Sequence, residues 1–334
     1  MVLHCGVMGY PVAHSLSPIL HQAAYHELGL DNVVAYDRVE VTPQEGPEFI
    51  KKCAQPHSSW SGLSVTMPHK QTLMERMDVL DPLAKVVGAL NTIVFSHSAP
   101  DDEALTSGFN TDVEGIVEAV RDVMNAEQIA DIASDSTGDS GRALILGSGA
   151  TACSSLAALT QLGYSEISVA ARRHYGEQRT SAAAQRMGLT IETHSLTHES
   201  DDNSELIGCP EPTSAELVPA LREHITSLCS SHSLMISTLP KGVADTWARY
   251  LHDAAIAGHI DLTGHYLLDV IYDPWPSPLS DAWRRAGGSL IPGYLMLLFQ
   301  AVPQVMLMTG QRPSVQPMRQ ALYQALEERG LEIL

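Results

Sequence analysis

Basic residues are scarce in this chain. Of its 334 residues, 20 are Lys or Arg and 39 are Asp or Glu, which gives a formal net charge of −19. Such an acidic excess argues against nucleic acid or an anionic membrane as a general partner. Any anion that the protein binds must therefore be held by a local group of basic side chains.

Cysteine is also rare, and its copies are scattered. Their number is odd and no C-x-x-C pair occurs, which is typical of reduced cysteines in a cytoplasmic protein. Histidines are more numerous, but none has the spacing to carboxylates or thiolates that a metal site requires, so we expect no metal. The cysteines are Cys5, Cys53, Cys153, Cys209 and Cys229.

The sequence lacks the patterns of a signal peptide and of a membrane span. The N-terminus has no basic region followed by an apolar one. The most apolar stretch, residues 290–308, is interrupted by prolines, a glycine and glutamines, so it predicts a buried helix. These features again predict a cytoplasmic protein.

Patterns typical of strands alternate with patterns typical of helices in the first third of the chain. This alternation favours parallel pairing of the strands within an α/β sheet. The expected strands cover residues 3–8, 33–39, 64–66 and 92–95, and the expected helices cover 17–28, 44–53 and 83–87.

The length of the chain allows two domains of ordinary size with a cleft between them. We place the boundary in a helix between Val113 and Val123. The first domain, residues 1–115, is completed by C-terminal helices within 293–334. The second domain covers residues 116–292.

A glycine-rich turn opens the second domain. Residues 143–146 and 167–171 predict two buried strands, joined by an alanine-rich helix. The motif G-x-G-x-x-A lies between the first strand and the helix, as in a Rossmann-like, doubly wound dinucleotide-binding sheet. Backbone N–H groups at such a helix start hold a pyrophosphate. The expected cofactor-binding residues are Gly147, Ser148, Gly149, Ala150, Thr151 and Ala152.

Two arginines follow the second of these strands. Arg172 and Arg173 stand where an NAD-binding chain carries an acidic residue for the ribose hydroxyls, and Arg179 lies a little further on. Two guanidinium groups can clamp a 2′-phosphate by paired hydrogen bonds. We therefore predict NADP(H) as cofactor; the alternative is that these arginines are merely solvated.

The stretch GLSVTMPHK ends in a lysine at the start of a helix. Pro68 suits the first helical turn, which also places Lys70 there. The positive end of the helix dipole disfavours a cation, which suits a lysine that exchanges a proton. An ordinary solvated lysine is the alternative. Ser17 and Pro18 similarly predict the N-cap and first position of another helix.

Four separated motifs in one order resemble the substrate-binding signatures of the shikimate dehydrogenase family. They are Ser15-Leu16-Ser17, Ser64 to Lys70, Ala89-Leu90-Asn91-Thr92 and Asn110-Thr111-Asp112. Ser64 stands where that family usually has asparagine, and in the arginine pair only Arg172 matches position by position.

The resemblance implies a role for each matching residue. Lys70 and Asp112 would be catalytic and would also bind substrate, and Ser15 and Ser17 would hold the substrate carboxylate. The other substrate-binding residues would be Thr66, Asn91, Tyr272 and Gln300, and Thr238, Leu239 and Gly293 would join the cofactor-binding set.

The implied activity is the reversible, NADPH-dependent reduction of 3-dehydroshikimate to shikimate, a step of aromatic amino acid biosynthesis. A quinate/shikimate dehydrogenase with relaxed specificity and a non-catalytic shikimate-binding regulator of the same fold are the alternatives. Residues 122–142 and 194–216 are expected to be an acidic linker and a surface insertion. The sequence does not fix the oligomeric state, and a homodimer is one assembly it allows.

Overall fold

The computed structural model describes residues 2–134, 141–196 and 217–334, which form two compact units. The first contains the residues up to Ile116 together with Met296–Ile333, and the second runs from Val117 to Leu295. Helix α5 (Asp112–Val123) spans the division between the two units.

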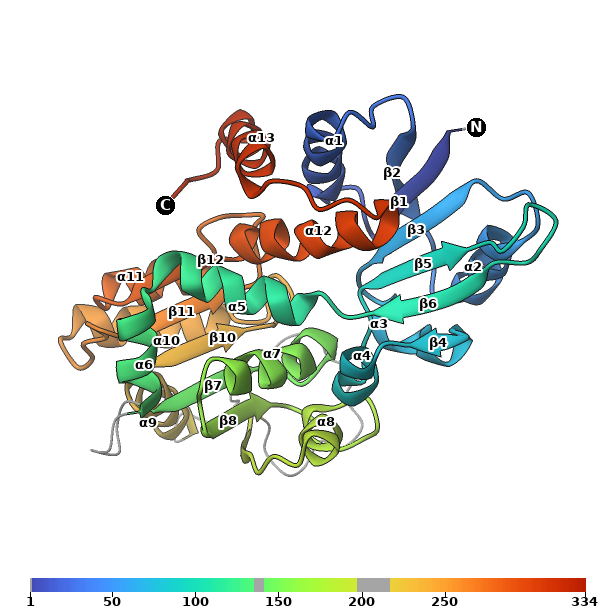
Figure 1. Cartoon of the computed structure of the whole chain (residues 1–334). Coiled ribbons are helices and arrows are strands. Elements are labelled where there is room, and N and C mark those ends of the chain that lie inside the picture. The colour runs from blue at the N-terminus through green and yellow to red at the C-terminus, as the bar shows by residue number, and fades with distance from the viewer. Residues whose placement is uncertain (1, 135–140, 197–216) are drawn as a thin grey trace. The chain divides into compact units, whose positions relative to one another are not determined.

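The first unit is built on a six-stranded mixed sheet of order β2-β1-β3-β5-β6-β4 (Figure 1). Strands β1, β2 and β3 pair in parallel, as predicted, but β5 runs antiparallel to both β3 and β6. Parallel pairing was the wrong prediction for β5. Strand β6, which the sequence analysis did not predict, runs antiparallel to β5 because the connection of residues 97–104 is too short for a crossover. The strands are β1 (Leu3–Gly9), β2 (Val34–Glu40), β3 (Trp60–Val65), β4 (Val79–Leu80), β5 (Thr92–Ser96) and β6 (Leu105–Phe109).

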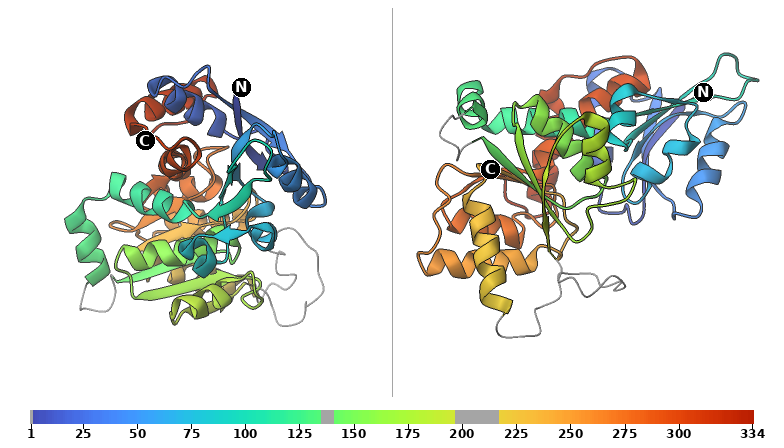
Figure 2. Two further views of the ribbon diagram at one scale, coloured as in Figure 1. Left: turned by 45° about the vertical axis from the view of Figure 1, so that its right-hand side comes forward. Right: turned by 90° about the horizontal axis from the view of Figure 1, so that it is seen from below.

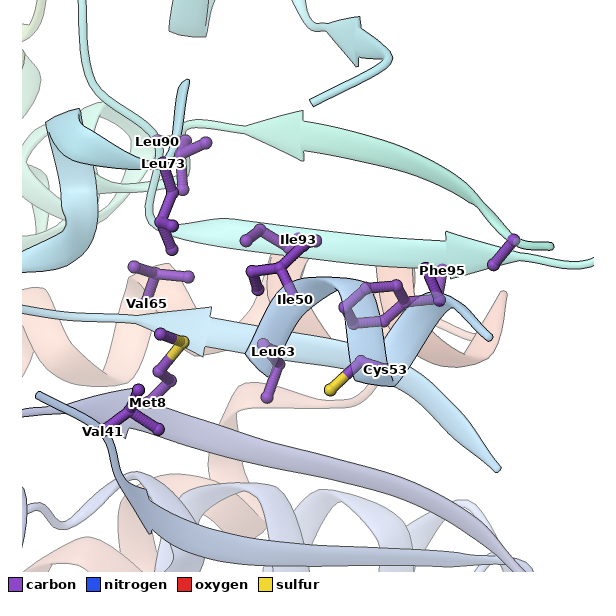
Figure 3. Close-up of a cluster of buried hydrophobic side chains, with 12 residues drawn as sticks. Met8, Val41, Ile50, Cys53, Leu63, Val65, Leu73, Leu90, Ile93 and Phe95 are labelled. Carbon is purple, nitrogen blue, oxygen red and sulfur yellow. The ribbon is translucent and has the colours of Figure 1, made fainter. Parts of the chain in front are cut away.

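One face of this sheet carries an apolar core beneath helix α2 (Gly46–Ala54) (Figure 3). Alternate residues of a strand point to opposite faces. Leu63 and Val65 of β3 and Ile93 of β5 therefore join the apolar cluster, while Ser64 and Thr92 face the other way. This alternation places polar side chains on a single face of the sheet.

Helices α1 (Ser17–Glu27), α12 (Gly293–Thr309) and α13 (Val315–Glu328) belong to the opposite face. The Ser61 hydroxyl of β3 donates to the carbonyl of Met308 on α12, and α13 packs beside α1. The sequence correctly predicts a buried helix in the apolar 290–308 stretch.

Two helix starts differ from the sequence prediction. Leu16 is the N-cap of α1, and Ser17 is its first residue. Ser15 lies before the cap, and its Oγ accepts from the Ser17 backbone N–H at 3.2 Å, so Ser17 is not needed as the cap. Pro68 is likewise the N-cap of α3 (His69–Thr72), and Lys70 lies in the first turn as predicted.

The second unit contains a six-stranded parallel sheet of order β12-β11-β10-β7-β8-β9. The chain order reverses after β9, when β10 returns to pair with β7, and helices lie on both faces of the sheet (Figure 2). The predicted doubly wound, Rossmann-like sheet is confirmed. The strands are β7 (Arg142–Leu146), β8 (Glu166–Ala171), β9 (Glu192–Ser195), β10 (Leu234–Ser237), β11 (Tyr266–Asp269) and β12 (Ser289–Pro292).

The second unit also contains the helices α6 to α11. The predicted linker 122–142 contains a helix, α6, and its residues 135–140 lie outside the described part of the chain, as do residues 197–216 of the predicted insertion. The helices are α6 (Ala126–Ser134), α7 (Ala150–Gln161), α8 (Thr180–Met187), α9 (Leu217–Ser230), α10 (Asp245–Ile256) and α11 (Pro278–Arg285); α4 (Pro82–Val87) and a 3-10 turn (Met74–Arg76) belong to the first unit.

Every helix within residues 2–134, 141–196 and 217–334 is too short or too polar to traverse a bilayer. Cys5, Cys53, Cys153 and Cys229 are buried free thiols, and Cys209 lies outside the described residues. Burial raises the pKa of the Cys5 thiol to about 11, which keeps it protonated and unreactive.

Candidate active site

Lys70 and Asp112 form an ion pair in the first unit. Lys70 comes from the first turn of α3 and Asp112 is the first residue of α5. The Lys70 Nζ donates to Asp112 Oδ2 at 2.6 Å, and the side chains are 14% and 0% exposed. A buried carboxylate is costly unless it is paired and hydrogen-bonded, so this cation and its neighbours stabilise it.

Asn91, just before β5, holds the other oxygen of the same carboxylate. Its Nδ2 donates to Asp112 Oδ1 at 2.8 Å, and its Oδ1 accepts from the Thr111 backbone N–H at 2.7 Å. Because a backbone N–H can only donate, the Thr111 bond fixes which end of the Asn91 amide faces Asp112. Both carboxylate oxygens are therefore held in defined directions.

Gln300 joins this group from helix α12. Its Oε1 accepts from Asn91 Nδ2 at 2.8 Å, and its backbone carbonyl accepts from the Thr111 hydroxyl at 3.1 Å. Lys70, Asp112, Asn91 and Gln300 thus form one hydrogen-bonded cluster, which we call the lysine cluster. It is drawn from four segments far apart in the sequence.

Ser15 and Ser17 form a second polar group at the start of α1. Both are buried, and the Ser15 hydroxyl donates to Ser17 Oγ at 3.2 Å. Arg38 of β2 donates to the Ser15 carbonyl through Nε at 3.0 Å and Nη2 at 2.6 Å. Thr66 follows β3, where its backbone N–H donates to the Met8 carbonyl at 2.9 Å.

The glycine-rich turn in the second unit fits a dinucleotide phosphate. Gly147 has φ +108°, and a Cβ there would lie 2.4 Å from the Thr238 hydroxyl, so only glycine is tolerated. Leu239 lies on the same side, 3.4 Å from that position. In the described ranges nothing lies within 4 Å of a Cβ added to Gly149, and no side chain caps α7. The open backbone and uncapped helix start match the requirements of a phosphate.

The other residues of the glycine-rich turn either begin helix α7 or form side-chain hydrogen bonds. Ala150, Thr151 and Ala152 form the first turn of α7. The Ser148 hydroxyl instead contacts Thr180, the first residue of α8, across 2.8 Å between Oγ atoms, and also accepts from the Thr180 backbone N–H at 3.1 Å. Ser148 therefore ties the glycine turn to the start of α8.

Arg172 and Arg173 directly follow β8, and both are exposed. They lie at the carboxyl end of the strand next to β7. Helix α8 begins at Thr180, so the connection from β8 includes Arg179. The location agrees with where a doubly wound sheet binds the ribose of a dinucleotide.

Tyr272 and Gly293 lie near the carboxyl end of β11. The sequence predicts a strand as far as Tyr272, but β11 ends at Asp269. Asp269 pairs in register with Pro292, which has no backbone N–H to donate. The Asp269 carboxylate accepts a hydrogen bond from the Ile271 backbone N–H at 3.3 Å. Tyr272 is consequently on a half-buried loop. Gly293 opens α12, and a Cβ there would lie 2.4 Å from the Asp269 carbonyl.

The sequence analysis missed several buried polar residues behind the lysine cluster. Tyr36 donates to Ser64 Oγ at 2.6 Å, and the Ser64 hydroxyl donates to Gln304 Oε1 at 2.9 Å. His21 of α1 stacks on Tyr36, with ring centroids 3.9 Å apart. A detectable signal was the spacing of Gln304 four residues after Gln300, which places both amides on one face of α12.

Burial shapes the titration of this group. It lowers the pKa of His21 to about 3, although the Gln304 hydrogen bond opposes the shift. It also raises the pKa of Tyr36 well above its usual range. His21 and Tyr36 are therefore neutral hydrogen-bonding groups near pH 7, and neither acts as an acid or base there.

Comparisons of this chain with known proteins all identify the same family. Residues 7–93 match the shikimate dehydrogenase substrate binding domain. A shikimate dehydrogenase (NADP(+)) of Paramagnetospirillum magneticum is 29% identical over 93% of this chain and 94% of its own length.

Two solved structures are similar to this chain over nearly its whole length. The shikimate dehydrogenase of Mycobacterium tuberculosis is 30% identical, with a TM-score of 0.69 over 96% of this chain and 99% of that one. A shikimate 5-dehydrogenase from Mycobacterium fortuitum is 32% identical, with a TM-score of 0.65 over 96% and 98%. With its two sheets, its glycine turn and its motifs in one order, this chain belongs to the shikimate dehydrogenase family.

Proposed function

We propose that this protein catalyses the reversible reduction of 3-dehydroshikimate to shikimate with NADPH, as an oxidoreductase acting on a CH–OH group in aromatic amino acid biosynthesis. The observation that carries the proposal is the buried pair of Lys70 and Asp112, held by Asn91 and Gln300 in a chain of this family. Such a pair suits proton exchange at an oxygen whose charge changes during reaction.

The chemistry divides between the cofactor and the lysine cluster. NADPH, when bound, supplies the hydride that the ketone carbon accepts. Lys70 donates a hydrogen bond to the ketone oxygen, stabilises the alkoxide that develops there, and gives it the proton that completes the hydroxyl. In the reverse direction, neutral Lys70 takes the proton from the hydroxyl of shikimate.

Asp112 orients the lysine and accepts a hydrogen bond from a ring hydroxyl of the substrate. Its Oδ1 is held by Asn91 and its Oδ2 by Lys70, so the direction of the ammonium is set before substrate binds. Preorganisation of this kind avoids reorganisation during the reaction. The substrate-positioning residues that we propose are Ser15 and Ser17 for the carboxylate, and Thr66, Asn91, Tyr272 and Gln300 for the hydroxyls.

The choice of NADP over NAD is attributed to Arg172 and Arg173. Both are exposed at the end of β8, where the 2′-phosphate of the adenosine ribose would lie. The pyrophosphate would be held by residues 147–152, beside Thr238 and Leu239, with Gly293 completing the same edge of the sheet.

A panel of two substrates and two nucleotides tests the proposal. The purified protein is assayed for nucleotide reduction with shikimate or quinate, each with NADP⁺ or NAD⁺. We expect the highest kcat/KM for shikimate with NADP⁺. A preference for quinate would identify the relaxed-specificity alternative, and a preference for NAD⁺ would remove the cofactor assignment. Shikimate binding by calorimetry without turnover would identify a non-catalytic regulator.

A further inference from the structure

Gln304 is a buried amide on the sheet-facing side of α12. Its side chain is 3% exposed, and it lies one helical turn beyond Gln300. Both ends of the amide are hydrogen-bonded to residues of the first unit. A buried amide with every group satisfied specifies one arrangement of its neighbours.

The carbonyl end of Gln304 receives two donors. The Ser64 hydroxyl donates to Oε1 at 2.9 Å, and His21 Nε2 lies 3.4 Å from the same oxygen. Tyr36 donates to Ser64, and Tyr25 lies 3.3 Å from His21 Nδ1. Since a neutral imidazole carries one N–H, His21 donates through Nε2 and accepts from Tyr25 through Nδ1.

The amino end of Gln304 is directed at Asn91. Nε2 donates to the Asn91 backbone carbonyl and to the Thr92 hydroxyl, at 3.2 Å in each case. The Thr92 hydroxyl then donates to Asn91 Oδ1 at 3.1 Å. Because a backbone carbonyl only accepts, the Asn91 bond requires Nε2 to face it. The hydrogen bonds consequently run in one direction, from the two tyrosines to Asn91.

We propose that Gln304 is a positioning residue for the reaction, acting through Asn91 on the orientation of the Asp112 carboxylate and hence of the Lys70 ammonium. Gln304 holds the Asn91 backbone carbonyl and, through Thr92, adds a second donor to the Asn91 side-chain oxygen that the Thr111 backbone N–H also holds. With Oδ1 held, Asn91 Nδ2 points at Asp112 Oδ1, 2.8 Å away. This inference rests on the proposed function and adds to it a residue that does not touch the reacting atoms.

The test replaces Gln304 by Met, which keeps the length and apolar volume of the side chain and removes its amide. We expect kcat for shikimate oxidation to fall about tenfold to a hundredfold, since small misplacements of catalytic groups have effects of that size. KM for NADP⁺ should change less than about twofold, because the glycine turn is untouched. The exposed Gln311, replaced by Met, is the matched control and should retain full activity.

A second measurement separates this inference from the proposed function. In a crystal structure of Gln304→Met, the distance from Asn91 Nδ2 to Asp112 Oδ1 should exceed hydrogen-bonding range. If the unaltered protein does not turn over shikimate, the proposed function fails, and the crystal structure still decides whether Gln304 positions Asn91. A variant with normal kcat and an unchanged Asn91 overturns the inference, even if its melting temperature is lower.

The variant Thr92→Val provides an independent test of the proposed role of Gln304. It removes the one hydroxyl that connects Gln304 Nε2 to Asn91 Oδ1 and should lower kcat in the same way. The double variant should lose less kcat than the product of the two single losses, because the bond from Gln304 through Thr92 is shared while Gln304 also holds the Asn91 backbone carbonyl directly. Additive losses of kcat contradict the inference. If Gln304→Met fails to fold, Thr92→Val alone carries the same prediction.

Discussion

The Lys70 ammonium meets the wholly buried Asp112 carboxylate at 2.6 Å. This distance identifies a direct ion pair between residues that begin two different helices, α3 and α5. A pair with one fully buried member has two consequences that can be measured separately. Removing Lys70 takes away the proton donor, and it also leaves a buried charge without its partner.

Replacing Lys70 by Ala is therefore expected to reduce turnover and stability together. Turnover should fall about 10²- to 10⁴-fold, as for loss of a general acid, while shikimate binding measured by calorimetry stays largely intact. The free energy of unfolding should fall by about 3–5 kcal/mol. Lys85→Ala, an exposed lysine on α4, should change neither quantity.

Adding Asp112→Asn to Lys70→Ala separates the two effects. The double variant should regain stability, because no buried charge is left unpaired, but it should remain inactive. Near-normal turnover in Lys70→Ala would refute its catalytic role.

Arg172 and Arg173 are expected to select NADPH over NADH. Charged hydrogen bonds contribute about 1.5–3 kcal/mol each, so replacing both arginines by Ala should raise KM for NADPH by at least about a hundredfold. KM for NADH should change little, because NADH has no 2′-phosphate. Initial rates with each nucleotide measure the effect, and Arg121→Ala, exposed on α5, is the control. Equal losses with both nucleotides would show that the arginines do not read the phosphate.

The sequence predicted those features that depend on short stretches of chain. The turn at Gly147, the strand before it, the helix after it and the first-turn position of Lys70 follow from local residue preferences, and the structure confirms them. The start of α1 was misplaced by one residue because Ser15 and Ser17 are both suited to accept a hydrogen bond at a helix start, and the local pattern does not show that Ser15 does so.

Contacts between distant segments could not be predicted in this way. The bond from Ser64 to Gln304 joins positions 240 residues apart, and the pairing of β5 with β6 depends on how the whole first sheet is assembled. A glutamine on an apolar helix is locally indistinguishable from a tolerated polar residue. Its role emerges only when strand β3 and helix α12 lie against each other (Figure 1).

Thr180 is expected to support nucleotide binding from α8. Thr180→Val keeps the shape of the side chain but removes the hydroxyl that contacts Ser148 at 2.8 Å. Loss of one hydrogen bond of about 1 kcal/mol should raise KM for NADPH about fivefold and leave KM for shikimate unchanged. Thr160→Val, at an exposed position of α7, is the matched control. A change in KM for shikimate instead of NADPH would contradict this role.

His232 should make the second unit sensitive to acid. Burial lowers the pKa of His232 from 6.5 to about 4, and its Nδ1 lies 2.8 Å from the Leu228 carbonyl. Between those two pKa values the unfolded chain binds a proton that the folded chain does not. The stabilising contribution is therefore complete above pH 6.5 and is lost as the pH falls toward 4.

Between pH 6.5 and pH 5, an interval of 1.5 pH units, the free energy of unfolding should fall by about 2 kcal/mol. His232→Asn cannot take up this proton, so the stability gap between it and the unaltered protein should narrow by about that amount from pH 7.5 to pH 5. Thermal or urea unfolding at both pH values measures the gap. His259→Asn, at an exposed position in the same unit, should keep a constant gap. A gap for His232→Asn that does not change with pH would show that this histidine is not the acid-sensitive group.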